Sequence, residues 1–495
     1  MTEKLVALVL SLLLFGFAYG LKRRTKSWTN PGVVFALFWF VMTFVPLLAV
    51  PEAAVAPWGM AFIVAAAVAF GMPSLFIDWA CANAACNSRL GPKPEASNLL
   101  FVAFVCLQLG ALACLLINLH LQGISPLAVF TDLMETAARY LTARYNHQIV
   151  ANPFSQLGVM ANYVGVAIGG FLVSRRSLRR NVLVYLLAFT PSFAHVLIYS
   201  DKGTIFLSAA YFFGAIIARR VRWGETDLIN RRTLTWTAVA LCILLPLMAI
   251  AMLVRGLGAW THDEVIGQVI YHLRSYAFAH VYAFSDWFCH IVTGRSVMTY
   301  TDPEGLTWGY WTFMSVGQRI WPGYVLPDGY FSEYFAVSGI IQSNIYTMFR
   351  GLIYDFGVWG ALVFMASFGW LSAFFYRQML SRAGAPFAEA YYIFLAGYIY
   401  TSYIISLTIW TSALAAFVGV YIVLKVDEFY LTCVRRKTGD GTVSPNNRLA
   451  FRAVEALHAS RPVRPPAARR VRDGSSGPEV KGRAFWIVSL QLAEN

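Results

Sequence analysis

The chain of 495 residues is 58% hydrophobic and 16% aromatic, and only 13% of its residues are charged. This composition excludes an ordinary soluble globular protein, because the hydrophobic residues gather in blocks close to the length of a membrane span. The formal net charge of +14 would favour nucleic acid as the partner of a soluble chain. Here the arginines flank the hydrophobic blocks, so we assign them to membrane topology and expect no nucleic-acid partner.

We expect an all-α, polytopic integral membrane protein with about 11 transmembrane helices. The candidate spans are residues 4–21, 31–50, 57–78, 98–119, 154–174, 182–200, 203–218, 234–254, 352–375, 387–405 and 408–425. The first is followed by positive charges at Lys22, Arg23 and Arg24, whereas a signal peptide carries its charge before the hydrophobic run. We therefore expect an uncleaved first span with the N-terminus outside.

The distribution of arginine supports this orientation. The short segments 22–30, 79–97, 175–181, 219–232 and 376–386 would lie inside, and they are rich in Lys and Arg, as the positive-inside rule requires. We predict a membrane domain over residues 1–430 with two long outside loops, 120–153 and 255–351. Residues 436–495 are rich in Arg, Pro, Ser and Gly, and we expect them to form a disordered basic tail in the cytoplasm that touches the bilayer surface.

Both long loops are expected to contain helices. In the first, Thr131 to Tyr145 forms a short helix with Glu135 and Arg139 at i,i+4 and Arg144 further on, which would also suit a solvated interfacial helix. The second loop is too rich in aromatic residues for disorder. Its residues 266–290 form an amphipathic helix suited to the membrane interface. On this helix His280 falls on the apolar side, where a packing role is favoured.

No motif for a common reaction is present, such as a Walker A loop, GxSxG, HExxH or paired CxxC.

Lys202, next to Asp201, stands at the outer end of a span, where a charge is often functional. Its alternative role is a snorkelling ion pair with Asp201. Asn344, Thr347, Arg350, Tyr354 and Asp355 are expected to share one polar helix face. They would either line a water-filled cavity or include an Arg–Asp ion pair that fixes the helix end.

Several outside arginines without a carboxylate cluster suit an anionic substrate, since guanidinium groups bind phosphate bidentately. We expect no cofactor and no metal ion.

Three stretches of the sequence resemble those of a known family: Asp201-Lys-Gly-Thr, Phe284-Ser-Asp-Trp-Phe, and Asn344-Ile-Tyr-Thr followed by Asp355-Phe-Gly. Over residues 195–375 the chain resembles the Wzy-type oligosaccharide repeat-unit polymerases of bacterial O-antigen, capsule and exopolysaccharide assembly. The last stretch is the most specific.

The resemblance implies a multi-pass protein of the bacterial inner membrane whose active face is periplasmic. Its substrate would be an oligosaccharide on undecaprenyl diphosphate, and its partners would include a chain-length regulator and a flippase. The growing glycan would move onto the non-reducing end of a new lipid-linked repeat, releasing the lipid diphosphate. The alternatives are the related O-antigen ligase, a flippase or exporter for lipid-linked sugars, and a structural partner of such an assembly complex.

The hypothesis assigns a role to each candidate residue. We expect metal-independent glycosyl transfer in which Arg274, Arg350 and Lys202 hold the diphosphate. Arg139 and Arg144 are further binding residues from the first loop, and Asn344, Thr347 and Tyr354 contribute polar contacts. The acceptor hydroxyl needs orientation and a base, for which the sequence offers His272, Asp286 and Asp355 without deciding among them.

Overall fold

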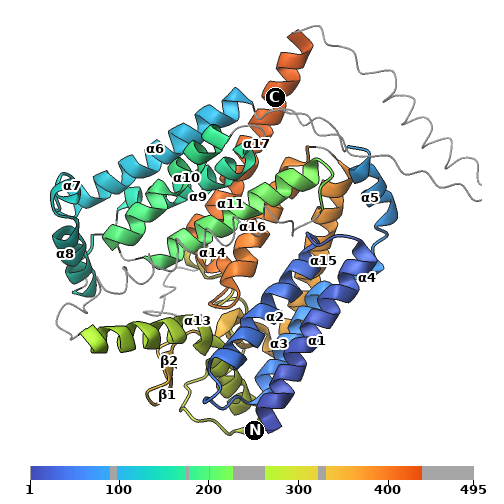
Figure 1. Cartoon of the computed structure of the whole chain (residues 1–495), viewed down its shortest axis with the longest axis vertical. Helices are drawn as coiled ribbons and strands as arrows, with labels where there is room; N and C mark the ends of the chain where they lie inside the picture. Colours follow the sequence, from blue (N-terminus) through green and yellow to red (C-terminus); the bar gives the residue numbers. More distant parts are fainter. Residues whose placement is uncertain are drawn as a thin grey trace, which may run out of the picture. The chain divides into compact units, whose positions relative to one another are not determined.

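The computed structural model describes residues 2–89, 97–146, 148–150, 152–173, 178–199, 201–226, 262–320, 331–382 and 384–437, and these are predominantly helical (Figure 1). The described residues up to Cys433 form one compact unit. The tail expected over 436–495 lies, beyond residue 437, outside the described residues, as does the candidate span 234–254.

The described elements follow the chain in order. The elements before the long loop are α1 (Thr2–Thr25), α2 (Pro31–Ala49), α3 (Pro57–Gly71), α4 (Pro73–Phe76), α5 (Ala80–Asn87), α6 (Asn98–Leu121), α7 (Ala128–Thr131), α8 (Leu133–Tyr145), α9 (Pro153–Leu172), α10 (Leu178–Tyr199) and α11 (Lys202–Arg222). The later elements are α13 (His262–Thr293), α14 (Met314–Ile320), β1 (Phe335–Val337), β2 (Ile341–Ser343), α15 (Thr347–Ser381), α16 (Pro386–Thr401), η1 (Leu407–Ile409) and α17 (Thr411–Lys437).

Eight helical segments among the described residues are long and hydrophobic enough to cross a bilayer. They are α1, α2, α3 with α4, α6, α9, α10, α11 and α15. Of the other expected spans, α16 is only 16 residues long, and α17 carries Lys425, Asp427 and Glu428 in its second half. The helical membrane-protein class is supported, whereas the count of eleven spans and the periplasmic position of the long loop stay predictions.

The helices begin where their sequences allow it. Proline occupies the first turn of α2, α3, α9 and α16, where its missing N–H costs nothing. Side chains at four helix starts accept a hydrogen bond from the first turn, as capping residues do: Asn30, Ser97, Asn152 and Asp201. Asp132 caps α8 in the same way, so the expected helix 131–145 begins at Leu133, and Thr131 is the last residue of the separate helix α7.

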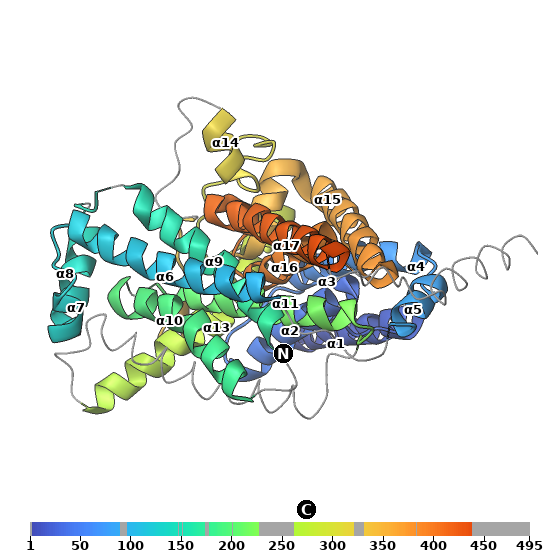
Figure 2. The same ribbon diagram turned by 90° about the horizontal axis from the view of Figure 1, so that it is seen from above.

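Two groups of helices pack together (Figure 2). One contains α1, α2, α3 and α15, the other contains α6, α9, α10 and α11, and α16 contacts both α11 and α15. A buried polar cluster ties the second group together: Asn162 Nδ2 donates to Ser192 Oγ at 2.9 Å and to Ser208 Oγ at 3.1 Å. Such hydrogen bonds hold helices together where no water competes for the polar groups.

Contacts define two ends of the compact unit. At the α13 end, the ammonium of Lys4 donates to the carbonyls of Val50 and Ala53 and to Tyr282 of α13. At the arginine end, Arg89 donates to the carbonyls of Arg222, Met379 and Leu380. At the same end Asn83 Nδ2 donates to Thr25 O, and Arg222 forms an ion pair with Glu389, with Nε 3.5 Å from Oε1. Four of the segments expected inside thus meet at one end, namely 22–30, 79–97, 219–232 and 376–386. The compartment that they face stays a prediction.

The described part of the long loop is built around α13, which runs across the lower ends of the neighbouring helices in Figure 1. The expected interfacial helix 266–290 is therefore present and extends to His262–Thr293. Its second half does not lie on a surface, because residues 279–284 and Trp287 are buried against α2 and α3. Gly59 of α3 permits this approach: a Cβ there would lie 2.5 Å from Ser285 Cα. His280 is buried with Nε2 2.9 Å from Met42 O, as a packing histidine would be.

A two-stranded hairpin, β1–β2, was not expected from the sequence. Its strands are antiparallel, with Phe335 opposite Ser343 and Val337 opposite Ile341. It packs on α13, where Ser275 Oγ accepts a hydrogen bond from Gln342 N at 3.0 Å. The hairpin leads directly into α15, so it sets the direction from which that helix begins.

We predict that Gly369→Ala disrupts the packing of α15 on α3. A Cβ at Gly369 would lie 2.0 Å from Phe70 O, a backbone atom that cannot rotate away. The two helices must separate, which should lower stability by about 1–3 kcal/mol. Thermal unfolding of the detergent-solubilised protein measures the loss. Gly110→Ala in α6, where no atom lies within 4 Å of the added methyl, is the matched control. Equal unfolding temperatures for both variants would contradict this packing.

Candidate functional site

The candidate site is centred on Arg350, in the first turn of α15, whose side chain is fully buried. Aromatic rings surround its guanidinium group, with Cζ 4.1–5.4 Å from each ring centroid. They belong to Trp287, Tyr300, Phe331, Tyr346 and Tyr354. Ring faces attract cations and stack on a planar guanidinium, so this arrangement offsets part of the cost of removing the charge from water.

The guanidinium is only partly satisfied by hydrogen bonds. Nε and Nη2 donate to Tyr354 Oη at 2.9 and 2.7 Å, and Nη2 also lies 3.3 Å from Glu333 Oε1. Nη1 is buried and has no hydrogen-bond partner in the structure. An arginine has five N–H donors, and leaving a buried donor unpaired costs about 1–3 kcal/mol. The arrangement therefore keeps donor capacity for an anionic ligand.

A carboxylate links Arg350 to a histidine at the edge of the site. Because Tyr354 Oη accepts from Arg350, its own proton points to Asp302 Oδ1, 2.5 Å away. Trp287 Nε1 donates to the same oxygen at 2.9 Å. The other oxygen, Oδ2, lies 3.5 Å from His290 Nε2. Asp302 thus connects the buried cation to an imidazole that is about one third exposed (32%).

Asp286, a sequence candidate for the base, holds the segment that follows α13. It accepts hydrogen bonds from Val297 N at 2.9 Å, Met298 N at 3.3 Å and Tyr300 Oη at 2.7 Å. Burial raises the pKa of Tyr300, so its hydroxyl stays protonated and remains a donor to Asp286. Asp286 therefore positions one ring of the Arg350 cage, and three donors occupy its carboxylate.

Asp355, the second carboxylate candidate, does not contact Arg350. Its buried carboxylate accepts hydrogen bonds from Thr307 Oγ1 at 2.6 Å, Trp311 N at 3.0 Å and Thr312 N at 2.6 Å. Residues five apart on a helix differ by about 140° in direction, so Asp355 and Arg350 face different neighbours. The Arg350–Asp355 ion pair weighed from the sequence is replaced by Arg350–Glu333.

The start of α15 departs from the expected regular helix. Asn344 lies before the helix, in the turn after β2, where its Nδ2 is 3.4 Å from Phe331 O, so it does not share the helix face. Thr347 has φ +66°, a strained value for a β-branched residue, and its Oγ1 accepts from Phe349 N at 3.2 Å. Gly357, with φ +72°, breaks the helix again. Arg350 and Tyr354 thus lie on a short helical segment between two backbone irregularities.

The other candidates lie away from Arg350. Arg274 is thirteen residues before Trp287 on α13, about 20 Å along the helix. Near it, Lys202 Nζ is 5.1 Å from the Tyr276 ring centroid. Burial and the Lys202 ammonium lower the pKa of His272, so the structure places these two residues near each other. On α8, Arg139 pairs with Glu135, with both side chains exposed, and Arg144 is exposed as well.

Sequence reasoning missed three residues of the site: Glu333, Asp302 and His290. Glu333 and His290 stand in the long loop as ionisable residues among aromatics, which was their signal, but their spacing gives no hint of a partner. Among the described residues, no group of three or more His, Cys, Asp or Glu side chains is placed to hold a metal ion.

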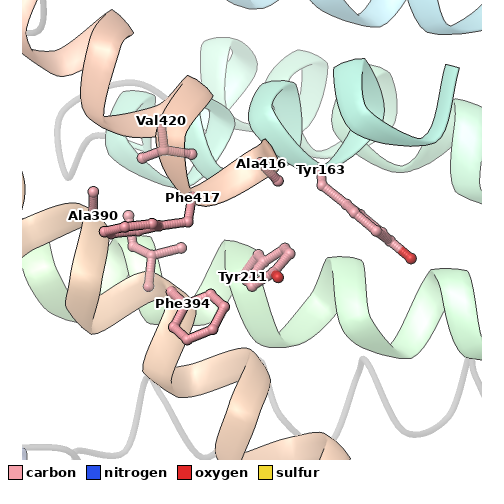
Figure 3. A pocket seen from close by; sticks show the side chains of 8 residues that line it. Tyr163, Tyr211, Ala390, Phe394, Ala416, Phe417 and Val420 are labelled. Atoms are coloured by element: carbon pink, nitrogen blue, oxygen red, sulfur yellow. The ribbon is translucent and has the colours of Figure 1, made fainter. Parts of the chain in front are cut away.

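An apolar crevice between α9, α11, α16 and α17 is a separate feature (Figure 3). It is lined by Tyr163, Tyr211, Ala390, Ile393, Phe394, Ala416, Phe417 and Val420. None of these side chains is charged, so the crevice suits hydrocarbon rather than an anionic group. The Arg350 cluster, not this crevice, is the candidate site.

We predict that Asp355→Ala destabilises segment 307–312. The variant leaves two backbone N–H groups and one hydroxyl without their acceptor, which should cost about 2–4 kcal/mol. Asp355→Asn keeps one acceptor oxygen and should lose less. Thermal unfolding and limited proteolysis between residues 305 and 320 measure the effect, with the exposed Glu304→Ala as control. Full stability of Asp355→Ala together with lost activity would instead favour a direct chemical role for this carboxylate.

Comparisons with known protein families, with curated protein sequences and with solved structures give no significant match. The resemblance to the Wzy-type polymerases therefore depends on the three stretches of sequence quoted above. The chemistry of the site is argued from its own geometry.

Proposed function

We propose that this protein polymerises lipid-linked oligosaccharide repeat units at the periplasmic face of the bacterial inner membrane, as a glycosyltransferase. The observation that carries the proposal is the buried guanidinium of Arg350, whose Nη1 has no hydrogen-bond partner. An anion that reaches this cation gains a charge-assisted hydrogen bond and satisfies a costly buried donor at the same time. A sugar diphosphate is an anion of this kind.

In this reaction the sugar–diphosphate bond breaks, and negative charge gathers on the departing diphosphate. A fixed cation in a site that excludes water stabilises such charge more than it stabilises the neutral part of the substrate. The ring cage and Tyr354 hold Arg350 in place before the substrate arrives, so little reorganisation is needed. Arg274, about 20 Å along α13 from Trp287, would contact a different part of a long glycan. Lys202 of α11, whose Nζ is 5.1 Å from the Tyr276 ring centroid, would do so from the same region.

The resting structure supplies a substitute for the substrate anion. Glu333 Oε1 lies 3.3 Å from Arg350 Nη2 and also accepts from Thr301 N at 3.1 Å. It neutralises part of the guanidinium charge, and a diphosphate would compete with it. Glu333 is thus the counterion of the free enzyme in this proposal.

The alternative functions differ in their products. An O-antigen ligase would form the same kind of bond but leave long chains on the carrier when it is missing. A flippase should carry charges near the middle of several spans, whereas the Arg350 cluster lies beside α13, at the α13 end. A structural partner would tolerate loss of the loop charges.

Deleting the gene in its host and restoring it with variants tests the proposal. Without the gene, single repeats on the carrier should accumulate outside and long chains should vanish in a size-resolved polysaccharide gel. Arg350→Lys, which keeps the charge but not the bidentate geometry, should lower polymerisation at least about 100-fold, and Arg274→Ala should shorten chains.

The exposed Arg295→Lys is the control, and the amount of each variant in the membrane is measured alongside. Normal long polymer from both Arg350→Lys and Arg274→Ala would refute the assignment. Repeats trapped on the cytoplasmic face would indicate a flippase, and long chains left on the carrier a ligase.

Glu333→Gln should bind diphosphate more tightly than the wild type. The substitution removes the negative charge that competes for Arg350 and keeps a polar side chain of similar shape. We expect the Kd for farnesyl diphosphate, measured by calorimetry on purified protein, to fall by about three- to tenfold. The exposed Glu304→Gln should leave it unchanged. Weaker binding by Glu333→Gln would show that Glu333 supports the site rather than competing for it.

A further inference from the structure

We propose that His290, held by Asp302, accepts the proton of the attacking sugar hydroxyl. This inference rests on the proposed function and names the base that the sequence left undecided. His290 Nε2 lies 3.5 Å from Asp302 Oδ2. Nδ1, on the opposite side of the ring, is 3.4 Å from Ser296 Oγ. Ser296 Oγ donates its own hydrogen to Met298 O at 2.6 Å, so it gives none to Nδ1. With the histidine proton on Nε2, facing the carboxylate, Nδ1 is the acceptor, and in the imidazolium that forms its new N–H faces Ser296 Oγ while Asp302 stabilises the charge.

His290 stands at the rim of the site that holds Arg350. Asp302 joins the two, since its Oδ1 accepts from Tyr354 Oη at 2.5 Å, and Tyr354 Oη accepts from Arg350. Arg350 is fully buried, whereas His290 is 32% exposed. A substrate that placed its diphosphate on Arg350 would therefore have its sugar end near the imidazole, where an acceptor hydroxyl arrives.

The other candidate bases are unsuited by their surroundings. Asp286 and Asp355 each accept three hydrogen bonds, and each fixes a loop. Three hydrogen bonds leave little of each carboxylate free to contact an acceptor hydroxyl. Glu333 shares one oxygen between Arg350 and Thr301 N, and His272 lies eighteen residues before His290, about 27 Å along α13.

The proposed step balances in atoms and electrons. The acceptor hydroxyl oxygen forms a bond to the anomeric carbon, and the bond from that carbon to the diphosphate oxygen breaks. The bonding electron pair leaves with the diphosphate, whose added charge Arg350 offsets. The hydroxyl proton moves to His290 Nδ1 and is returned to water once the lipid diphosphate departs.

Two groups lie close to the His290 ring. Asp302 approaches Nε2, and the Tyr300 ring centroid is 5.5 Å from the imidazole centroid. Asp286, one turn earlier on α13, accepts the hydrogen bond of Tyr300. Burial raises the pKa of Tyr300, so Tyr300 stays a neutral donor to Asp286. A pH dependence of the rate that disappears in His290→Gln would therefore be assigned to His290.

The experiment compares variants in proteoliposomes, with lipid-linked repeats extracted from the deletion strain as substrate. His290→Gln is the key variant, because its side-chain amide can still donate to Asp302 but cannot accept a proton. We expect a rate about 10²–10⁴-fold below the wild type and loss of the acid limb of the pH–rate profile. The Kd for farnesyl diphosphate should stay within about twofold, since Arg350 is intact. Asp302→Asn should slow the reaction while keeping the histidine.

The exposed His120→Gln in α6 is the matched control. A His290→Gln protein that polymerises at the wild-type rate with an unchanged pH profile would overturn the inference. Loss of farnesyl diphosphate binding in His290→Gln would also overturn it, by giving His290 a structural role. If the deletion strain accumulates no lipid-linked repeats, the proposed function fails instead, so the two failures are distinguishable.

Discussion

Burial of the Arg350 guanidinium is the constraint around which the rest of the long loop is arranged. Taking this charge out of water costs several kcal/mol, and no single element can offset that cost. Trp287 comes from α13, Tyr300 from the segment after it, and Phe331 and Glu333 from the segment before β1. Two features bring these groups together around Arg350. The helix α13 packs against α3, and Asp286 accepts hydrogen bonds from the segment that follows α13.

The polar network has a direction. Protons point from Arg350 to Tyr354 and from Tyr354 to Asp302, and the imidazole of His290 stands on the far side of that carboxylate. A permanent cation is thus deep in the protein, and an imidazole that can accept a proton is at the rim. This separation suits a glycosyl transfer in which the diphosphate leaves at the buried Arg350 and the acceptor hydroxyl arrives at the solvent-exposed His290.

Hydrophobic block length predicted, among others, the eight described helical segments that are long and hydrophobic enough to cross a bilayer. Helical periodicity predicted α13, and both signals are local. The partners of Arg350 were beyond such reasoning. Tyr354 is one turn away and was placed correctly beside it, but Glu333 reaches Arg350 only through a hairpin that no pattern indicated. Asn344 was placed on the helix because nothing in the sequence shows that α15 begins at Thr347, whose φ of +66° is disfavoured for threonine. Asp355 was grouped with Arg350 by proximity in sequence, although five residues turn the two apart.

The way in which Asp355 holds segment 307–312 has a consequence for the evolution of this surface. Two of its three bonds go to main-chain N–H groups, and the side chain of Trp308, in the middle of the segment, is 74% exposed. The backbone path at Trp308 is therefore fixed by bonds that do not involve its side chain. The residue at this one position can change without loss of the support for Arg350, whereas Thr307 and Trp311 cannot, because Thr307 Oγ1 bonds Asp355 and the Trp311 ring packs on Phe331.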